Sequence, residues 1–139
     1  MTVGPHMLAL NAGSSTLKFS LFSLDASTTC VLSGVVDRIG SAHSTISVTS
    51  GAAHEGKSLA ISAPDHVAAL HEVLRCVSAT NIKMDAVGHR IVHGGERYRA
   101  AQRVDAPMCE ELRRIIDLDR EHLPSALAMI EAITVAFPE

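Results

Sequence analysis

Two apolar runs near the start of the chain, separated by six small residues, constrain its fold most. The first run is Leu-Ala-Leu at 8–10, and the second extends from Leu17 to Leu24. Between them stands Asn-Ala-Gly-Ser-Ser-Thr, residues 11–16. A short polar segment that contains Asn and Gly between two strand-like runs is typical of a tight turn. The pattern therefore predicts a β-hairpin.

The turn of this hairpin has the composition of an anion site. Gly13 permits close backbone approach, and the short side chains around it leave room for a bulky anion such as phosphate. Lys18 stands two residues past Thr16, so both can project to one side of the second strand, where the lysine offers a positive charge. An ordinary tight turn without a ligand is the alternative interpretation.

A second informative segment, residues 86–96, reads Ala-Val-Gly-His-Arg-Ile-Val-His-Gly-Gly-Glu. We expect a strand over Asp85–Val92, in which Arg90 and Val92 share one face. A guanidinium can hold a small carboxylate in a fork while the neighbouring valine contacts its alkyl end. In the alternative interpretation, Arg90 pairs with an acidic residue and Gly94-Gly95 forms only a turn.

Together the two segments resemble the acetate/propionate kinase family. Its first hairpin is similar to LNAGSSSLKF and its substrate strand to GHRxVHGGE. Here they read LNAGSSTLKF and GHRIVHGGE, in the same order and with similar spacing. Butyrate kinases share a related first loop but not the His-Arg-x-Val-His-Gly-Gly run. The resemblance extends from Met7 through the last helical segment.

The resemblance implies an α/β fold, the ribonuclease-H-like domain of the acetate and sugar kinase, Hsp70 and actin superfamily, with a mixed sheet and flanking helices. Residues 7–139 then form the N-terminal, first domain of an acetate kinase. Family members are roughly three times longer, which accords with two such domains around a cleft. The second domain, and the strand that carries the catalytic aspartate, are absent from this chain, so we expect these residues alone to be inactive.

The activity implied by the resemblance is transfer of the γ-phosphoryl group of ATP to acetate or propionate, which gives acyl phosphate and ADP. Mg²⁺ is the implied cofactor, and the full-length enzyme is expected to be a cytoplasmic homodimer. A butyrate-type kinase and a non-catalytic binding or dimerisation module are the alternatives. The implied site comprises Asn11 for the metal, Ser14, Thr16 and Lys18 for the nucleotide phosphates, Arg90 and Val92 for the substrate, and His122 near the transferred phosphoryl group.

One departure from the family concerns the residues around His122. The family usually reads Ala-Pro-Leu-His-Asn-Pro-x-Asn there, whereas this chain reads Asp-Arg-Glu-His-Leu-Pro-Ser-Ala at 119–126. Glu121 replaces the apolar residue that commonly lines the acyl pocket, and a carboxylate there would repel a carboxylate substrate. Three explanations remain open: Glu121 points away, Arg120 pairs with it, or substrate choice differs.

Composition excludes other function classes. The net charge of −3 and the 3% aromatic content give no basis for a nucleic-acid surface. No apolar run approaches membrane-spanning length, and the three cysteines lie far apart, which is typical of reduced, mostly buried thiols. We expect neither nucleic acid nor membrane as a partner.

The periodicity predicts the remaining elements, and the implied cleft predicts their geometry. Strands are expected over Met7–Asn11, Leu17–Leu24, Cys30–Ile39, Ser44–Val48 and Leu59–Ser62. Helices are expected after Pro64-Asp65, Pro107 and Pro124, with apolar stripes facing inward at Val67, Leu70, Leu74 and Val77, at Leu112, Ile115 and Ile116, and at Leu127, Ile130 and Phe137. The hairpin at Asn11–Lys18, the strand end at Arg90–Gly95 and the start of the helix after His122 should converge on one face.

Overall fold

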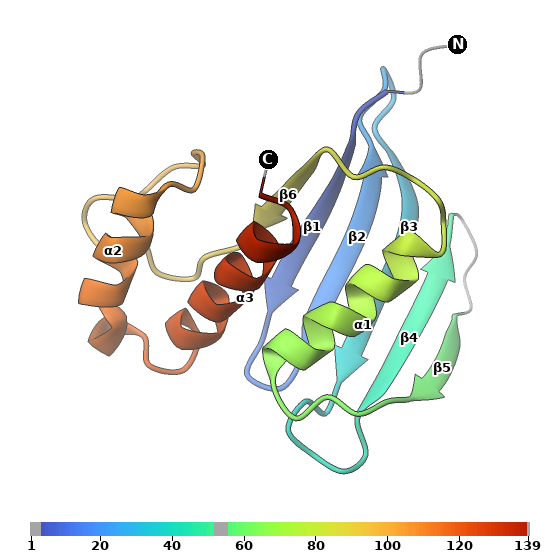
Figure 1. Cartoon of the computed structure of the whole chain (residues 1–139), viewed down its shortest axis with the longest axis horizontal. Coiled ribbons are helices and arrows are strands. Elements are labelled where there is room, and N and C mark those ends of the chain that lie inside the picture. The colour runs from blue at the N-terminus through green and yellow to red at the C-terminus, as the bar shows by residue number, and fades with distance from the viewer. Residues whose placement is uncertain (1–3, 52–55, 139) are drawn as a thin grey trace. The chain divides into compact units, whose positions relative to one another are not determined.

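The structure, a computed structural model, describes residues 4–51 and 56–138. The chain divides into two compact units, Met1–Arg90 and Ile91–Glu139. Figure 1 labels the strands and the α-helices of both units. The first unit contains β1 (His6–Ala12), β2 (Leu17–Ser23), β3 (Thr29–Asp37), β4 (Thr45–Ser50), β5 (Lys57–Ala60), α1 (His66–Ser78) and β6 (Ala86–His89). The second contains α2 (Ala106–Arg114), the short 3₁₀ helix η1 (Ile116–Leu118) and α3 (Leu123–Ala136).

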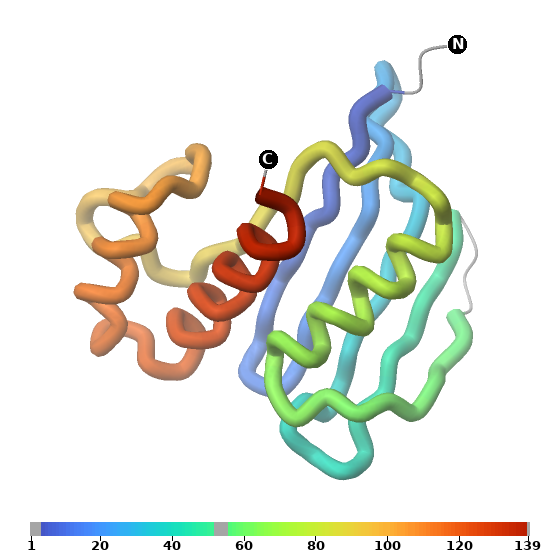
Figure 2. Tube along the Cα trace, viewed as in Figure 1, coloured from blue at the N-terminus to red at the C-terminus, as the bar shows by residue number. Residues whose placement is uncertain are grey.

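The strands of the first unit form one mixed sheet in the order β5-β4-β3-β2-β1-β6. The consecutive strands β1 to β5 pair antiparallel with one another, whereas β6, which follows α1, lies parallel to β1. Figure 2 follows this path along the chain trace. The predicted hairpin is therefore confirmed, and the predicted five early strands are all present.

Alternation along β1 and β2 separates the two faces of the sheet. Leu8 and Leu10 of β1 are buried, as are Leu17, Phe19 and Leu21 of β2. α1 packs on β2 and β3 and lies across this face (Figure 1). Because successive strand side chains point to opposite faces, the residues between these buried ones belong to the face away from α1.

α1 begins where the sequence predicts. Asp65 caps its N-terminus, and the carboxylate Oδ1 accepts a hydrogen bond of 2.8 Å from the backbone N–H of Ala68. The buried stripe is shifted slightly from the predicted one. Leu70 and Val77 are buried as expected, but Ala69 and Val73 complete the stripe, with Val67 and Leu74 only half-buried.

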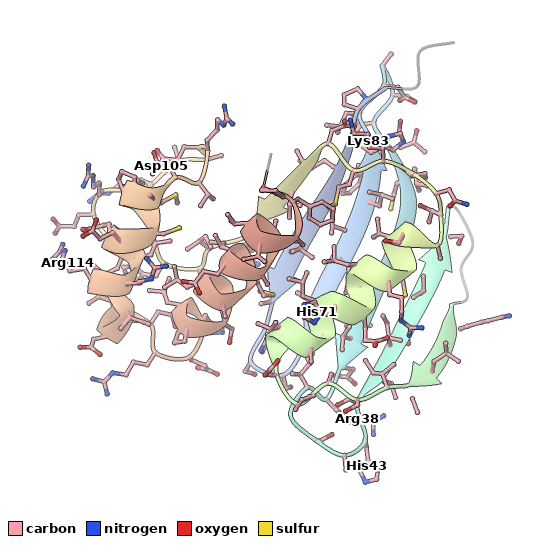
Figure 3. The ribbon with its side chains drawn as sticks, in the orientation of Figure 1. Arg38, His43, His71, Lys83, Asp105 and Arg114 are labelled. Carbon is pink, nitrogen blue, oxygen red and sulfur yellow. The ribbon has the colours of Figure 1, made fainter. Side chains whose placement is uncertain are left out.

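The second unit has its own apolar core. It consists of Met108, Leu112 and Ile115 from α2 and the residue after it, with Leu123 and Leu127 from α3. Asp105 caps α2 through a 2.8 Å hydrogen bond from the backbone N–H of Met108 (Figure 3). The prediction that Phe137 faces inward is wrong: α3 ends at Ala136, and Phe137 is 45% exposed.

The strand predicted over Asp85–Val92 extends three residues too far at its C-terminal end, because β6 ends at His89. The backbone N–H of Arg90 still donates to the carbonyl of Leu10 at 3.0 Å, and the pairing with β1 stops there. Arg90 and Val92 therefore do not share a strand face, and the alternation argument fails for them. Val92 instead precedes a turn and is 54% exposed.

Gly34 in β3 tests how tightly this sheet is packed. A Cβ atom there would lie 2.3 Å from the carbonyl oxygen of Ser47 and 2.6 Å from the ring of Phe19, its cross-strand partner. Gly34→Ala should therefore lower the free energy of unfolding by about 1–3 kcal/mol. Gly88→Ala is the matched control, since its Cβ meets nothing nearer than Met7 Sδ at 3.7 Å. Equal losses for the two variants in urea titrations would contradict the packing argument.

Candidate active site

A pocket of about 470 Å³ lies in the first unit, on the sheet where β1, β2 and β6 run side by side. A volume of this size is typical of small-ligand sites. The lining of the pocket includes polar side chains and small residues that leave room for a ligand: Ala9, Asn11, Lys18, Ser20, Gly88 and Arg90.

Strand register brings the three principal polar side chains of the pocket together. Asn11 near the end of β1 is paired directly with Lys18 near the start of β2. On the other side of β1, Leu10 is in register with His89, so Arg90 stands beside Asn11 in the next position. Residues paired across neighbouring strands share a face, which is why Asn11 and Arg90, far apart in sequence, line one pocket. This part of the predicted convergence is confirmed.

The pocket is positively charged and its charges are uncompensated. Its lining contains a lysine and an arginine and no aspartate or glutamate. Among the described residues, neither Lys18 nor Arg90 forms an ion pair. The alternative in which Arg90 pairs with an acidic residue is therefore wrong within the described residues. His89 is also in the lining, and burial lowers the pKa of its imidazole, which disfavours a positive charge on that ring.

The loop between β1 and β2 closes through one backbone hydrogen bond, from the N–H of Gly13 to the carbonyl of Thr16 at 2.9 Å. Thr16 also explains the glycine, since a Cβ at Gly13 would lie 2.5 Å from Thr16 Oγ1. Ser14 is exposed and Thr16 half-buried, and neither hydroxyl is hydrogen-bonded within residues 4–51 or 56–138. The loop is thus a tight turn that leaves its hydroxyls available to a ligand.

Sequence reasoning missed His66, which anchors this loop. The ring of His66 is buried at the start of α1, and its Nε2 lies 2.8 Å from the carbonyl oxygen of Gly13. A carbonyl can only accept, so Nε2 donates. His66 and Gly13 are 53 positions apart, and nothing in the sequence links them. Sequence reasoning also missed Gly88 in the pocket lining, although a glycine inside a strand pattern is a signal that could have indicated it.

The glycine pair after Arg90 has a structural role. A Cβ at Gly94 would lie 2.1 Å from the carbonyl oxygen of Tyr98, and Gly95 has a φ of +69°. The N–H of Tyr98 donates to the carbonyl of Gly94, and the N–H of Gly95 donates to Nδ1 of His93. The alternative in which these glycines make a turn is therefore confirmed.

His122 and Val92 belong to the second unit, and their convergence with Arg90 stays a prediction. Within that unit His122 directly precedes α3, and its ring Nδ1 lies 3.0 Å from Asp119 Oδ1. Arg120 pairs with Asp117 at 2.8 Å, so the explanation in which it pairs with Glu121 is wrong. Glu121 itself is exposed.

The described residues hold no group of three His, Cys, Asp or Glu side chains arranged for a metal ion. Asn11 is nevertheless a suitable donor, because Mg²⁺ keeps several waters and phosphate oxygens and needs only one or two protein oxygens. None of the helices over residues 4–51 and 56–138 is long and apolar enough to cross a membrane. Cys30, Cys76 and Cys109 are free thiols and only half-buried, rather than mostly buried as predicted.

Comparison with known proteins gives the family of this chain. The sequence profile of the Acetokinase family matches residues 6–139. This chain belongs to the acetokinase family. It is 39% identical to the acetate kinase of Deinococcus radiodurans over 134 residues, which are 95% of this chain and 33% of that protein. The chain therefore spans about a third of the length of the curated relatives it matches.

Solved structures confirm the fold of this acetokinase chain. The crystal structure of Porphyromonas gingivalis acetate kinase matches with a TM-score of 0.85 and 28% identity, over 97% of this chain and 35% of that one. A propionate kinase from Francisella tularensis matches with a TM-score of 0.84 at 23% identity, over the same 97% and 35%. The α/β domain with a mixed sheet is that of the acetate and sugar kinase, Hsp70 and actin superfamily, as predicted.

The His66 anchor yields a prediction about the loop. His66→Ala leaves the Gly13 carbonyl without its donor, so the free energy of unfolding should fall by about 1–3 kcal/mol. His66→Gln keeps a donor at a similar distance and should recover part of the loss. His71→Ala on the exposed side of α1 is the control (Figure 3). If His66→Ala and His71→Ala unfold at the same denaturant concentration, the anchor has no energetic weight.

Proposed function

We propose that the full-length protein containing this chain transfers the γ-phosphoryl group of ATP to acetate or propionate, giving acyl phosphate and ADP. The proposal rests on one observation: Asn11, Lys18 and Arg90 line the same pocket, and this lining contains no aspartate or glutamate. A carboxylate and a chain of phosphates are both anions, and such a pocket suits them together.

In this proposal Arg90 holds the substrate carboxylate through a fork of charge-assisted hydrogen bonds, and Val92 contacts the alkyl end. The absence of an ion-pair partner for Arg90 among the described residues supports this role, because the guanidinium is available to an external anion. An arginine is favoured over a lysine here because its planar fork matches a carboxylate.

In the proposal, the phosphates of the nucleotide bind beside Arg90, at Lys18 and at the loop between β1 and β2. Lys18 supplies a positive charge, and the hydroxyls of Ser14 and Thr16 supply hydrogen bonds from the loop. The amide oxygen of Asn11 fits Mg²⁺ directly or through water, and Mg²⁺ would neutralise charge on the nucleotide phosphates. Lys18 and Asn11 are directly paired across β1 and β2, so charge and metal ligand would act on adjacent oxygens.

His122 is proposed to hydrogen-bond the transferred phosphoryl group, where developing charge benefits from a fixed donor. Residues 7–139 are proposed to be the first of two similarly folded domains, with the catalytic aspartate in the remainder. The whole enzyme is proposed to be a cytoplasmic homodimer. The coverage of only about a third of each curated relative supports the division.

A butyrate-type kinase remains the second candidate because of one observation. Glu121 is exposed and stands beside His122, where the family usually has an apolar residue. If this carboxylate faces the substrate, it replaces an apolar wall of the acyl pocket, and the preference among short-chain carboxylates would differ from that of the family. Comparing kcat/KM for acetate, propionate and butyrate in the full-length protein separates the two candidates. A non-catalytic binding or dimerisation module would turn over none of them.

Arg90→Ala in the full-length protein tests the substrate assignment. The variant loses charge-assisted hydrogen bonds of about 1.5–3 kcal/mol, so kcat/KM for the carboxylate should fall roughly 10- to 150-fold. The KM for ATP should change little. Acyl phosphate trapped as the hydroxamate gives the rate.

Arg103→Ala is the matched control, because Arg103 is an exposed arginine without an ion pair among the described residues. Unchanged carboxylate kinetics in Arg90→Ala, with the control equally unchanged, would remove Arg90 from the substrate site.

The 139-residue chain by itself should form no acyl phosphate. Phosphoryl transfer requires all of the groups around one site at once, and the proposed catalytic aspartate lies outside these residues. The same hydroxamate assay on the purified chain, with a mock purification to exclude host kinase, measures this. Turnover above the mock sample would show that these residues alone assemble a site.

A further inference from the structure

The second unit contains an aspartate–histidine pair that the family pattern does not predict. Where the family usually reads Ala-Pro-Leu before the histidine, this chain has Asp119, Arg120 and Glu121. Asp119 is the residue after η1, and His122 directly precedes α3. The two side chains thus meet in the short connection between two helices.

Three hydrogen bonds fix this connection, and two of them use one oxygen of Asp119. Oδ1 accepts from the backbone N–H of His122 at 3.1 Å and contacts the ring Nδ1 at 3.0 Å. The backbone carbonyl of Asp119 accepts from the N–H of Leu123 at 3.0 Å. Leu123 is buried in the core of the second unit, so the pair rests on a packed segment.

The contacts of Asp119 with His122 favour the ionised form of its carboxyl group. Its side chain is only 12% exposed and that of His122 is 28% exposed. Burial by itself raises the pKa of Asp119, but the hydrogen bonds from the His122 ring and backbone outweigh it and leave this pKa below its ordinary value. His93, in the same unit, also lowers it. An ionised carboxylate can only accept, so the ring must hold its proton on Nδ1.

We propose that Asp119 is a positioning residue that holds His122 in the Nδ1-protonated form and leaves Nε2 available to the phosphoryl group. The role in phosphoryl transfer rests on the proposed function; the ring state does not. A neutral imidazole in this form has no N–H at Nε2. Donation from Nε2 to a phosphoryl oxygen therefore requires the doubly protonated ring, whose positive charge the Asp119 carboxylate would balance.

The contact between Asp119 and His122 lies where this chain departs from the family sequence. The Ala-Pro-Leu and Asn residues around the family histidine are replaced here by side chains of different chemistry. A carboxylate bonded to Nδ1 orients the ring from behind, in the way that partners of functional imidazoles commonly do. Asp117, two residues earlier, has no such role, since it is 73% exposed and pairs with Arg120.

The ring state is tested on the 139-residue chain, without reference to activity. Long-range ¹H–¹⁵N NMR correlations report which ring nitrogen of His122 carries the proton in its neutral form. We expect Nδ1 protonation in the wild-type chain and in Asp117→Asn, and loss of this preference in Asp119→Ala. Asp119→Asn keeps an oxygen for the backbone N–H of His122 and removes the charge, and it serves if the alanine variant does not fold. A ring state that is the same in all folded variants would overturn the proposal.

The positioning role is tested on the full-length enzyme. Asp119→Asn should lower kcat for acyl phosphate formation about 10- to 100-fold, with the KM values for carboxylate and ATP within roughly twofold of wild type. Asp117→Asn should retain wild-type kcat. An altered ring state with unchanged kcat would overturn the positioning role. A wild-type full-length protein without activity would overturn the proposed function and this role with it, while the NMR result would still decide the ring state.

Discussion

The antiparallel pairing of β1 with β2 is the interaction on which the rest of the structure depends. Its register sets Asn11 opposite Lys18 and, one step away, sets Leu10 opposite Phe19. Strand side chains alternate between faces, so a single register fixes both the core under α1 and the polar face opposite it. A slip of one residue would bury the lysine and expose the phenylalanine, and the apolar contacts with α1 oppose such a slip. Core stability and site geometry are therefore set by one pairing.

The return of the chain through α1 adds what the hairpin lacks. β6 lies parallel to β1, so its carboxyl end reaches the same edge as that of β1, and Arg90 comes to stand beside Asn11. The hairpin contributes an amide and an amine, and the crossover contributes a guanidinium. Ligands in open α/β sheets bind at the carboxyl ends of strands, where such crossovers deliver side chains. His66 joins the two parts from within the crossover, because it begins α1 and bonds to the turn of the hairpin.

Much of this arrangement could be predicted from the sequence, and the errors have physical causes. The two apolar runs around a polar turn predict the hairpin, and the alternation of side chains along a strand predicts its two faces. Asp65 and the helical spacing of the apolar residues after it predict α1. The strand through Val92 was predicted too long because Ile91 and Val92 favour strands locally, whereas the partner strand offers its last hydrogen bond to Arg90. Phe137 was placed inward by helical spacing, but the helix ends one residue earlier. Pairing partners and helix ends are set by tertiary contacts that local propensity does not contain.

The site divides in the same way. Asn11, Lys18 and Arg90 could be predicted because each lies in a short, recognisable sequence motif. Their convergence on one pocket follows from the strand register. His66 could not be predicted, since its contact with the turn is one hydrogen bond to a backbone carbonyl 53 positions away, and every residue type has a backbone carbonyl. Asp119 lies between these cases. The sequence shows its departure from the family, but only the geometry shows that the carboxylate takes both the backbone N–H and the ring nitrogen of His122. In this chain the residue that departs from the family pattern has a defined partner, because its carboxylate binds both the backbone and the ring of His122.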